Sequence, residues 1–159
     1  MRRLGVIAIA ILLTGCANSQ ISSNYTISEN DVSAISIDAP TKFSVSRVVV
    51  LANGVAEIMN SLNAKSIIVG RDISSTEKAL ENVPLATSGH QVLPEEVIAL
   101  KPDLVIIDAS TGPKAALAQI KSAGIRVVQT PESWTLEDIS IKVAAVAAAI
   151  GAPQQGVLL

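Results

Sequence analysis

Short apolar runs alternate with amphipathic segments along most of the chain. Four runs rich in β-branched residues are typical of strands, and the first three have the continuous apolar character of strands covered on both faces. These predicted strands lie at 47–51, 67–69, 104–107 and 125–128. A polar, irregular stretch at 71–88 interrupts the alternation.

Between and after these runs, apolar residues recur at helical spacing. Prolines suited to a first helical turn and glycines suited to a helix end mark the boundaries. The predicted helices cover 54–63, 94–100, 113–124 and 136–150. Strands that alternate with helices predict an α/β fold with an open, mainly parallel sheet and helices on both faces. Ligands of such sheets bind outside the carboxyl ends of the strands, so the loops after the strands become the candidate site.

Composition narrows the classes of function. The chain has 159 residues, of which 49% are hydrophobic, 16% charged and 2% aromatic, with a formal net charge of -2. This balance excludes a disordered chain and argues against a nucleic-acid partner, which would call for a basic face and stacking aromatics. One Cys and one His cannot form a Cys/His zinc cluster or an intrachain disulfide.

The amino terminus has the order of a secretory signal. A basic start, Met1 to Arg3, precedes an apolar run, Leu4 to Leu13, that is too short to span a bilayer comfortably. Residues 13–16 resemble the lipobox of bacterial lipoproteins, which implies a signal peptide at 1–15 and a lipid-modified Cys16. A plain signal peptide is the alternative. We expect residues 16–46 to be a polar tether and the protein to be lipid-anchored on the extracytoplasmic side of the cell membrane.

Three groups of residues carry a wider resemblance. They are Val69–Asp72 with Ser74–Thr76; Gly89-His90 followed by 94–105, which includes Leu-Lys-Pro-Asp-Leu-Val; and Gly112-Pro113 with 123–125 and 150–153. Together they are similar to the binding proteins of iron-siderophore, haem and cobalamin ABC importers, and most similar to haem-binding lipoproteins of the HmuT type. The resemblance covers about 47–155. It implies a substrate-binding protein with haem as the transported ligand.

Members of that family have two lobes, with the ligand between them. The resemblance identifies 47–155 with the amino-terminal lobe and 156–159 with the truncated start of the connection to the second lobe. Three interpretations of the chain stay open: a truncated product, a fragment of a gene, or a genuine one-lobe protein. The second axial ligand in the family is a Tyr of the other lobe, for which Tyr25 in the tether is a poor substitute. Glu77-Lys78-Ala79 stands where the family usually has a Pro, so that loop is expected to differ.

His90 is the chain's only histidine and follows Gly89 in a predicted loop at the binding edge. A neutral imidazole is a good axial ligand for haem iron, and the resemblance implies this role for His90. The alternative is an exposed loop histidine that ligates nothing. With a ferric siderophore or cobalamin as the ligand, His90 would supply only a polar contact.

Other candidate ligand-binding residues lie in the same predicted loops. Arg71 could pair with a haem propionate, or instead with Asp72 or a helix end. Ser110 and Thr111 precede a helix and place hydroxyls and amides where an anion could bind. Trp134 could pack on a flat macrocycle, or cover the core beneath its loop.

Glu95 occupies the position whose counterpart in the family docks on the ABC-transporter permease. An exposed carboxylate could set the orientation of docking, or it could simply compensate the positive end of its helix. The chain contains no G-x-S-x-G, Walker or G-x-G-x-x-G pattern, so we do not expect an enzyme. A surface-anchored interaction or sensor domain without a small ligand is the alternative from another class.

Overall fold

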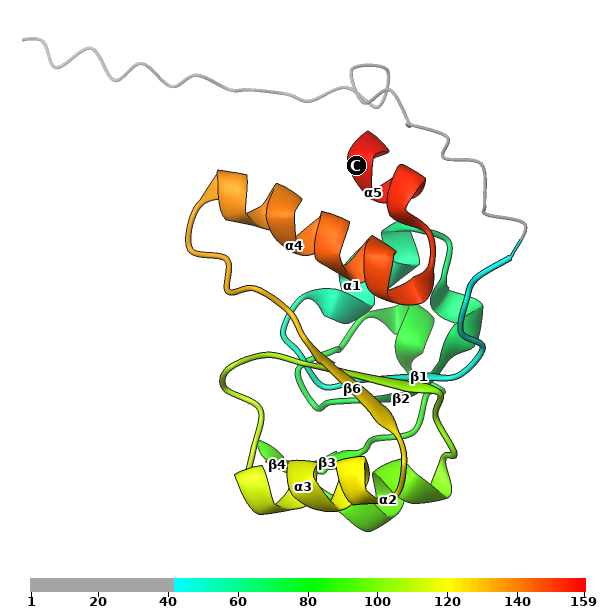
Figure 1. Cartoon of the computed structure of the whole chain (residues 1–159), viewed down its shortest axis with the longest axis vertical. Coiled ribbons are helices and arrows are strands. Elements are labelled where there is room, and N and C mark those ends of the chain that lie inside the picture. Colours follow the sequence, from blue (N-terminus) through cyan, green and yellow to red (C-terminus); the bar gives the residue numbers. More distant parts are fainter. Residues whose placement is uncertain (1–41) are drawn as a thin grey trace, which may run out of the picture. The chain divides into compact units, whose positions relative to one another are not determined.

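The computed structural model describes residues 42–159, and its centre is a sheet of four parallel strands (Figure 1). The strand order is β2-β1-β5-β6. The strands are β1 (Val48–Val50), β2 (Ile68–Arg71), β5 (Leu104–Ile107) and β6 (Arg126–Gln129). This confirms the predicted α/β fold with a mainly parallel sheet.

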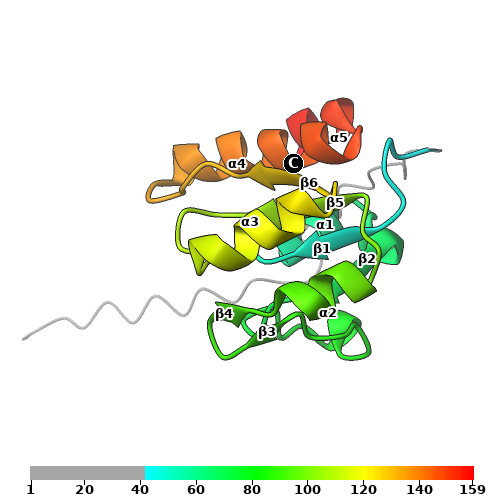
Figure 2. The same ribbon diagram turned by 60° about the horizontal axis from the view of Figure 1, so that its bottom comes forward.

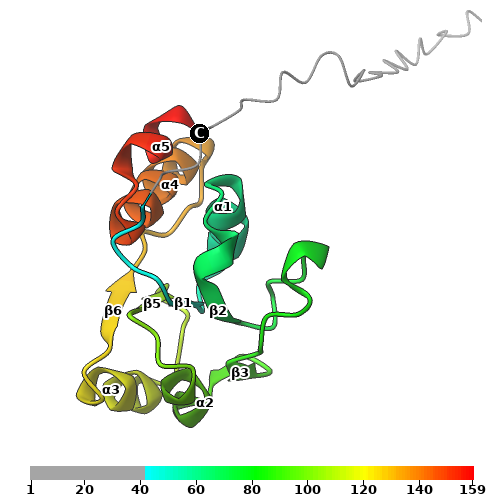
Figure 3. The same cartoon turned by 90° about the vertical axis from the view of Figure 1, so that its right-hand side faces the viewer.

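Helices cover both faces of this sheet, as predicted (Figures 1 and 3). On one face lie α1 (Val55–Ser61) and α4 (Leu136–Ile150), with α5 (Pro153–Leu158) beside α4. On the other face lie α2 (Pro94–Ala99) and α3 (Lys114–Ser122), as Figure 2 also shows. Two short 3-10 turns, Lys65–Ile67 and Lys78–Leu80, complete the helical segments. None of the helices in residues 42–159 is long and apolar enough to span a bilayer.

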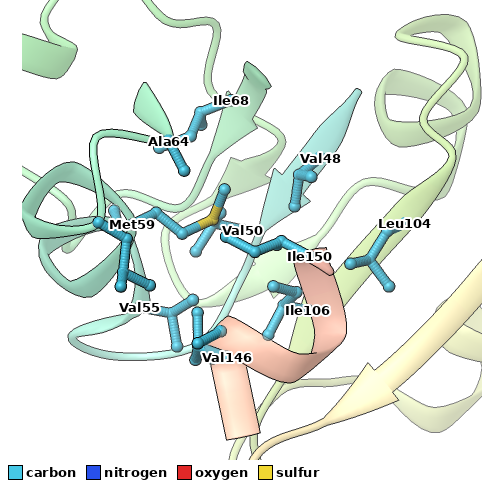
Figure 4. Packing of buried hydrophobic residues seen from close by; sticks show 14 of the residues in the cluster. Val48, Val50, Val55, Met59, Ala64, Ile68, Leu104, Ile106, Val146 and Ile150 are labelled. Carbon is cyan, nitrogen blue, oxygen red and sulfur yellow. The ribbon is translucent and has the colours of Figure 1, made fainter. Parts of the chain in front are cut away.

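The alternation of side chains along the strands explains the two apolar layers. Val48 and Val50 point to the α1/α4 side, where they pack with Met59 and Ile150 (Figure 4). Val49 points to the α2/α3 side, in a second buried cluster. Burying a side chain of this size contributes about 1.5–3 kcal/mol, so both faces of the central strand hold the sheet and helices together.

The stretch predicted to be irregular contains structure that the pattern did not reveal. Within it and just beyond, β3 (Thr87–Ser88) pairs with β4 (Gln91–Val92) as an antiparallel hairpin. Each strand is only two residues long, which is too short to produce a recognisable periodicity. The hairpin is fixed to the loop after β5, because the Val92 amide donates to the Gly112 carbonyl at 2.9 Å.

Both ends of the described segment pack on the α1/α4 side. The Ser44 amide donates to the Ile150 carbonyl at 2.9 Å, and Phe43 and Val45 contact the apolar cluster. At the other end, α5 lies against α4 at Gly156, where an added Cβ would come within 2.6 Å of the Ala147 Cβ. The signal peptide, Cys16 and the tether up to residue 41 lie outside the described residues, and the predicted domain boundaries stay predictions.

The order of the strands defines where a ligand can bind. The chain passes from β1 to its neighbour β2 on one side, and then crosses to β5 on the other side of β1. The carboxyl ends of β1 and β5 therefore send their loops in opposite directions. In open parallel sheets the crevice at such a switch point is the usual ligand site.

Candidate ligand-binding site

A hollow of about 120 Å³ lies at the carboxyl ends of the strands, at this switch point. The segments that follow β1, β2 and β5 line it together with the β3/β4 hairpin. We refer to it as the strand-edge hollow. Its lining residues are Leu51, Asn53, Asp72, Ile73, Thr87, Gly89, His90, Val92, Ser110 and Thr111. The sequence-predicted residues His90, Ser110 and Thr111 are thus brought together.

The β3/β4 hairpin presents His90 at the rim of this hollow. Gly89 and His90 form the two-residue turn, and Gly89 has a φ of 57°, a conformation that glycine adopts without strain. The side chain of His90 is exposed. Because the hairpin is hydrogen-bonded to Gly112, the backbone of His90 is held beside the loop that contains Ser110. His90 thus lies exposed at the strand tips, and its role as an iron ligand stays a prediction.

Asp108 organises the loop after β5 from a buried position, with 5% of its surface exposed. Its carboxylate accepts from the Ser110 hydroxyl at 2.6 Å, the Ser110 amide at 2.9 Å and the Thr111 hydroxyl at 3.0 Å. It also accepts from the Asn53 amide at 2.9 Å, which joins the loops on the two sides of the switch point. Burial alone would raise the pKa of Asp108, but these hydrogen bonds outweigh it and lower the pKa below its ordinary value.

Asp72 organises the loop after β2 in the same way, from a buried position with 8% of its surface exposed. Its carboxylate accepts from the hydroxyls of Ser74 and Ser75 and from the Ser74 amide. The Ser74 hydroxyl also lies 3.0 Å from Oδ1 of Asn53. Asn53 thereby contacts both carboxylate-centred loops, and its carbonyl accepts from the buried Lys142 ammonium at 2.7 Å.

Arg71 uses its guanidinium within its own loop. Nε donates to the carbonyls of Leu80 and Val83, both at 3.0 Å, and Nη1 donates to the carbonyl of Ser75 at 2.9 Å. The side chain is half-buried and is not among the residues that line the strand-edge hollow. The structure thus shows how Arg71 holds the loop between residues 75 and 83, while its role toward a ligand stays a prediction.

Trp134 and Glu95 are both exposed. Trp134 lies in the loop between β6 and α4, with 85% of its surface exposed, so the alternative that it covers the core is wrong. It does not line the hollow. Glu95 lies in the first turn of α2, where its carboxylate also suits the positive end of the helix. Ligand contact by Trp134 and docking through Glu95 stay predictions.

Among the described residues, no group of three His, Cys, Asp or Glu side chains could hold a metal ion. The lining of the hollow contains one imidazole, that of His90. Asn53, Ile73 and Thr87 also line the hollow. Asn53 lies in the loop after the first predicted strand, which the sequence places at the binding edge, whereas Ile73 and Thr87 were not singled out.

Comparisons with known proteins agree with this architecture. A family described as "Periplasmic binding protein" matches residues 48–157. A solved haem-binding protein, HmuT, is 34% identical with a TM-score of 0.67, and the match covers 71% of this chain and 38% of that one. The haem-binding protein RhuT from Roseiflexus sp. RS-1 is 33% identical with a TM-score of 0.66, over 70% of this chain and 43% of that one.

A periplasmic haem-binding protein from Pseudomonas aeruginosa is 29% identical, with a TM-score of 0.65 over 70% of this chain and 40% of that one. A search of curated proteins found no match. The chain therefore spans about two-fifths of the length of the solved structures named here, which fits a single lobe. By its matched residues and its fold, this chain belongs to the periplasmic binding protein family.

Proposed function

We propose that this chain is the amino-terminal lobe of a lipid-anchored substrate-binding protein that captures haem for an ABC importer. The observation that carries the proposal is the position of His90. The only imidazole of the chain stands exposed at the rim of a hollow at the switch point of the sheet. The solved structures named above, which are described as haem-binding proteins, support haem over other ligands.

In this proposal His90 ligates the ferric iron of haem through one ring nitrogen. The hairpin fixes the backbone of His90, so the imidazole is presented at the rim of the hollow. The macrocycle lies over the apolar part of the hollow, with Ser110 and Thr111 at its edge. Trp134, exposed in the neighbouring loop, supplies a flat apolar surface to the same ligand.

The other parts of the proposed function concern the cell envelope. Cys16 is the site of lipid attachment, which keeps the protein at the outer face of the cell membrane. Glu95 is the contact with the permease, where an exposed carboxylate guides docking onto basic residues. Arg71 supports the loop after β2, and a second lobe would close over the ligand from the opposite side.

The direct test is a titration of the purified chain, without a histidine tag, with ferric haem. We expect a shifted Soret band with one haem bound per chain. In His90→Ala the affinity should fall by about tenfold or more, which corresponds to ~1.4 kcal/mol or more. Gln91→Ala, which truncates the neighbouring exposed side chain, is the matched control and should bind as the unmodified chain does.

Full retention of the Soret band and affinity in His90→Ala would reject His90 as the ligand. A colourless protein that is stabilised against heat by a ferric siderophore or cobalamin, and not by haem, would reject haem as the cargo. Stabilisation by none of these ligands would reject a substrate-binding role.

A further inference from the structure

Amides and hydroxyls in the two loops beside the strand-edge hollow are already engaged by the protein itself. In the loop after β5, the Ser110 amide and hydroxyl both donate to the Asp108 carboxylate, and the Thr111 amide donates to the Asp108 carbonyl at 3.3 Å. The Ala109 amide donates to Oε1 of Glu132 at 3.1 Å. The amides of residues 109–111, which could have held an anion, are thus occupied by two carboxylates and one backbone carbonyl.

The loop after β2 repeats this arrangement. The Ser74 amide and hydroxyl and the Ser75 hydroxyl all donate to Asp72, while the Ile73 amide donates to the Thr87 hydroxyl at 3.2 Å. A hydroxyl has one proton to donate and two acceptor lone pairs. Hydroxyls that donate to a buried carboxylate therefore offer only acceptor oxygens to anything that enters the hollow.

No cationic side chain lines the hollow. Two cations contact its loops from outside the lining: Arg71 donates to the carbonyls of its own loop, and Lys142 donates to the carbonyl of Asn53. The remaining lining is apolar, and is contributed by Leu51, Ile73 and Val92.

Haem has two chemically different edges, one with apolar methyl and vinyl groups and one with two propionate carboxylates. From the two buried carboxylates, the engaged donors and the absence of a lining cation, we propose that the hollow fixes the orientation of the ligand. The apolar edge of the macrocycle enters the hollow, and the propionates are directed away from Asp72 and Asp108. This inference rests on the proposed function and adds a specificity rule to it.

Ser110 and Thr111 then act differently from the anion-binding role that their position before a helix predicts. They contribute acceptor oxygens to the rim and help to keep ligand carboxylates out of it. The buried carboxylates are the residues that determine the orientation, and they act through charge without contacting the iron.

The test compares ferric haem with its dimethyl ester, in which both propionates are neutral, by Soret titration of the same chain. We expect the ester to bind as tightly as haem or more tightly. In Asp108→Asn, which keeps the size of the side chain and an acceptor oxygen, haem should gain about threefold in affinity, the size expected for unit charges about 7 Å apart in water. The affinity for the ester should stay unchanged.

Glu81→Gln is the matched control, since it removes an exposed carboxylate that does not line the hollow and should leave both affinities unchanged. Thermal unfolding of each variant shows whether it is folded, and Asp72→Asn provides a second variant if Asp108→Asn is not. Ester binding weaker than haem binding by tenfold or more, or an equal change of both affinities in both variants, would overturn the orientation. No Soret shift with either compound would overturn the proposed function and the orientation together.

Discussion

The two edges of the parallel sheet use aspartates in different ways. At the amino edge, Oδ2 of Asp103 accepts from the Ser46 amide at 2.7 Å, the Ser46 hydroxyl at 2.8 Å and the Arg47 amide at 2.9 Å. The guanidinium of Arg47 continues to the last carbonyls of the α2 region, with 2.7 Å between Nη2 and the Leu100 oxygen. The positive charge of Arg47 therefore lies near Asp103, and these hydrogen bonds join the segments that precede β1 and β5.

At the carboxyl edge, Asp72 and Asp108 likewise receive their hydrogen bonds from amides and hydroxyls. The pKa of Asp103 is lowered by the Ser46 hydrogen bonds and also by the charge of Arg47, whereas the pKa of Asp108 is lowered mainly by hydrogen bonds from Ser110, Asn53 and Thr111 against the effect of burial. The same side chain thus joins elements at one edge and lies beside a hollow without a lining cation at the other. Under the proposed function, the carboxyl edge serves the ligand and the amino edge serves stability.

Removing the central carboxylate of the carboxyl edge should have the largest effect. In Asp108→Ala, the Asn53 amide and the Ser110 amide and hydroxyl all lose their acceptor in a partly buried place. We expect a loss of about 2–4 kcal/mol in the free energy of unfolding, together with weaker haem binding, because the rim loses its shape. Urea unfolding and Soret titration measure the two effects. Unchanged stability would show that the loop does not depend on Asp108.

Removing the aspartate of the amino edge should affect stability alone. In Asp103→Ala, the hydrogen bonds to Ser46 and Arg47 are lost at an exposed position, where water replaces part of them. We expect a loss of about 1–2 kcal/mol in urea unfolding, with the haem affinity within about twofold of its original value. A large fall in haem affinity at unchanged stability would contradict the proposed separation of the two edges.

The crowding of negative charge near the carboxyl edge extends to Glu57 of α1. Burial, a hydrogen bond with Glu77 and the charges of Glu77 and Asp72 raise its pKa from 4.5 to about 7. Oε2 of Glu77 is buried, and no donor reaches it among the described residues, so a proton on Glu57 would satisfy it. The folded state therefore keeps a proton that the unfolded chain has lost between pH 4.5 and about 7. Over this range stability should fall as the pH rises.

Glu57→Gln removes this titration and should flatten the pH dependence. We expect the variant to gain roughly 1 kcal/mol at pH 8, a value reduced for screening because Glu57 is exposed, and to match the unmodified chain near pH 4.5. Urea unfolding across this pH range measures the difference. Glu96→Gln, at an exposed position on the opposite face of the sheet, is the control. A parallel pH profile of Glu57→Gln and the unmodified chain would contradict the account.

The sequence predicted the framework well because the framework depends on local patterns. The apolar run at 104–107 and the helix at 136–150 have the bounds that their periodicity and their capping residues indicate. Gly151 ends this helix with a φ of 84°, in the conformation that glycine favours. The location of the site at the carboxyl ends of the strands followed from the alternation of strands and helices, whereas the switch point became visible only with the strand order.

The details of the site could not be predicted, because they arise from contacts between residues far apart in the chain. The bond from the Asn53 amide to Asp108 joins positions 55 residues apart. No local pattern indicates that the hydroxyls of Ser74 and Ser110 donate to buried carboxylates. The guanidinium of Arg71 was a candidate for a ligand carboxylate from the sequence, and only the fold reveals the loop carbonyls that it contacts.

The most direct test of the account is to identify the atom bound to the iron. The chain has one histidine, so growth with ¹⁵N-histidine labels His90 alone. Pulsed electron paramagnetic resonance of the ferric haem complex, prepared without a histidine tag or imidazole buffer, should then detect a directly bonded ¹⁵N nucleus. A haem complex in which the labelled and unlabelled chains give identical spectra would show that His90 is not the ligand, and would contradict the central claim.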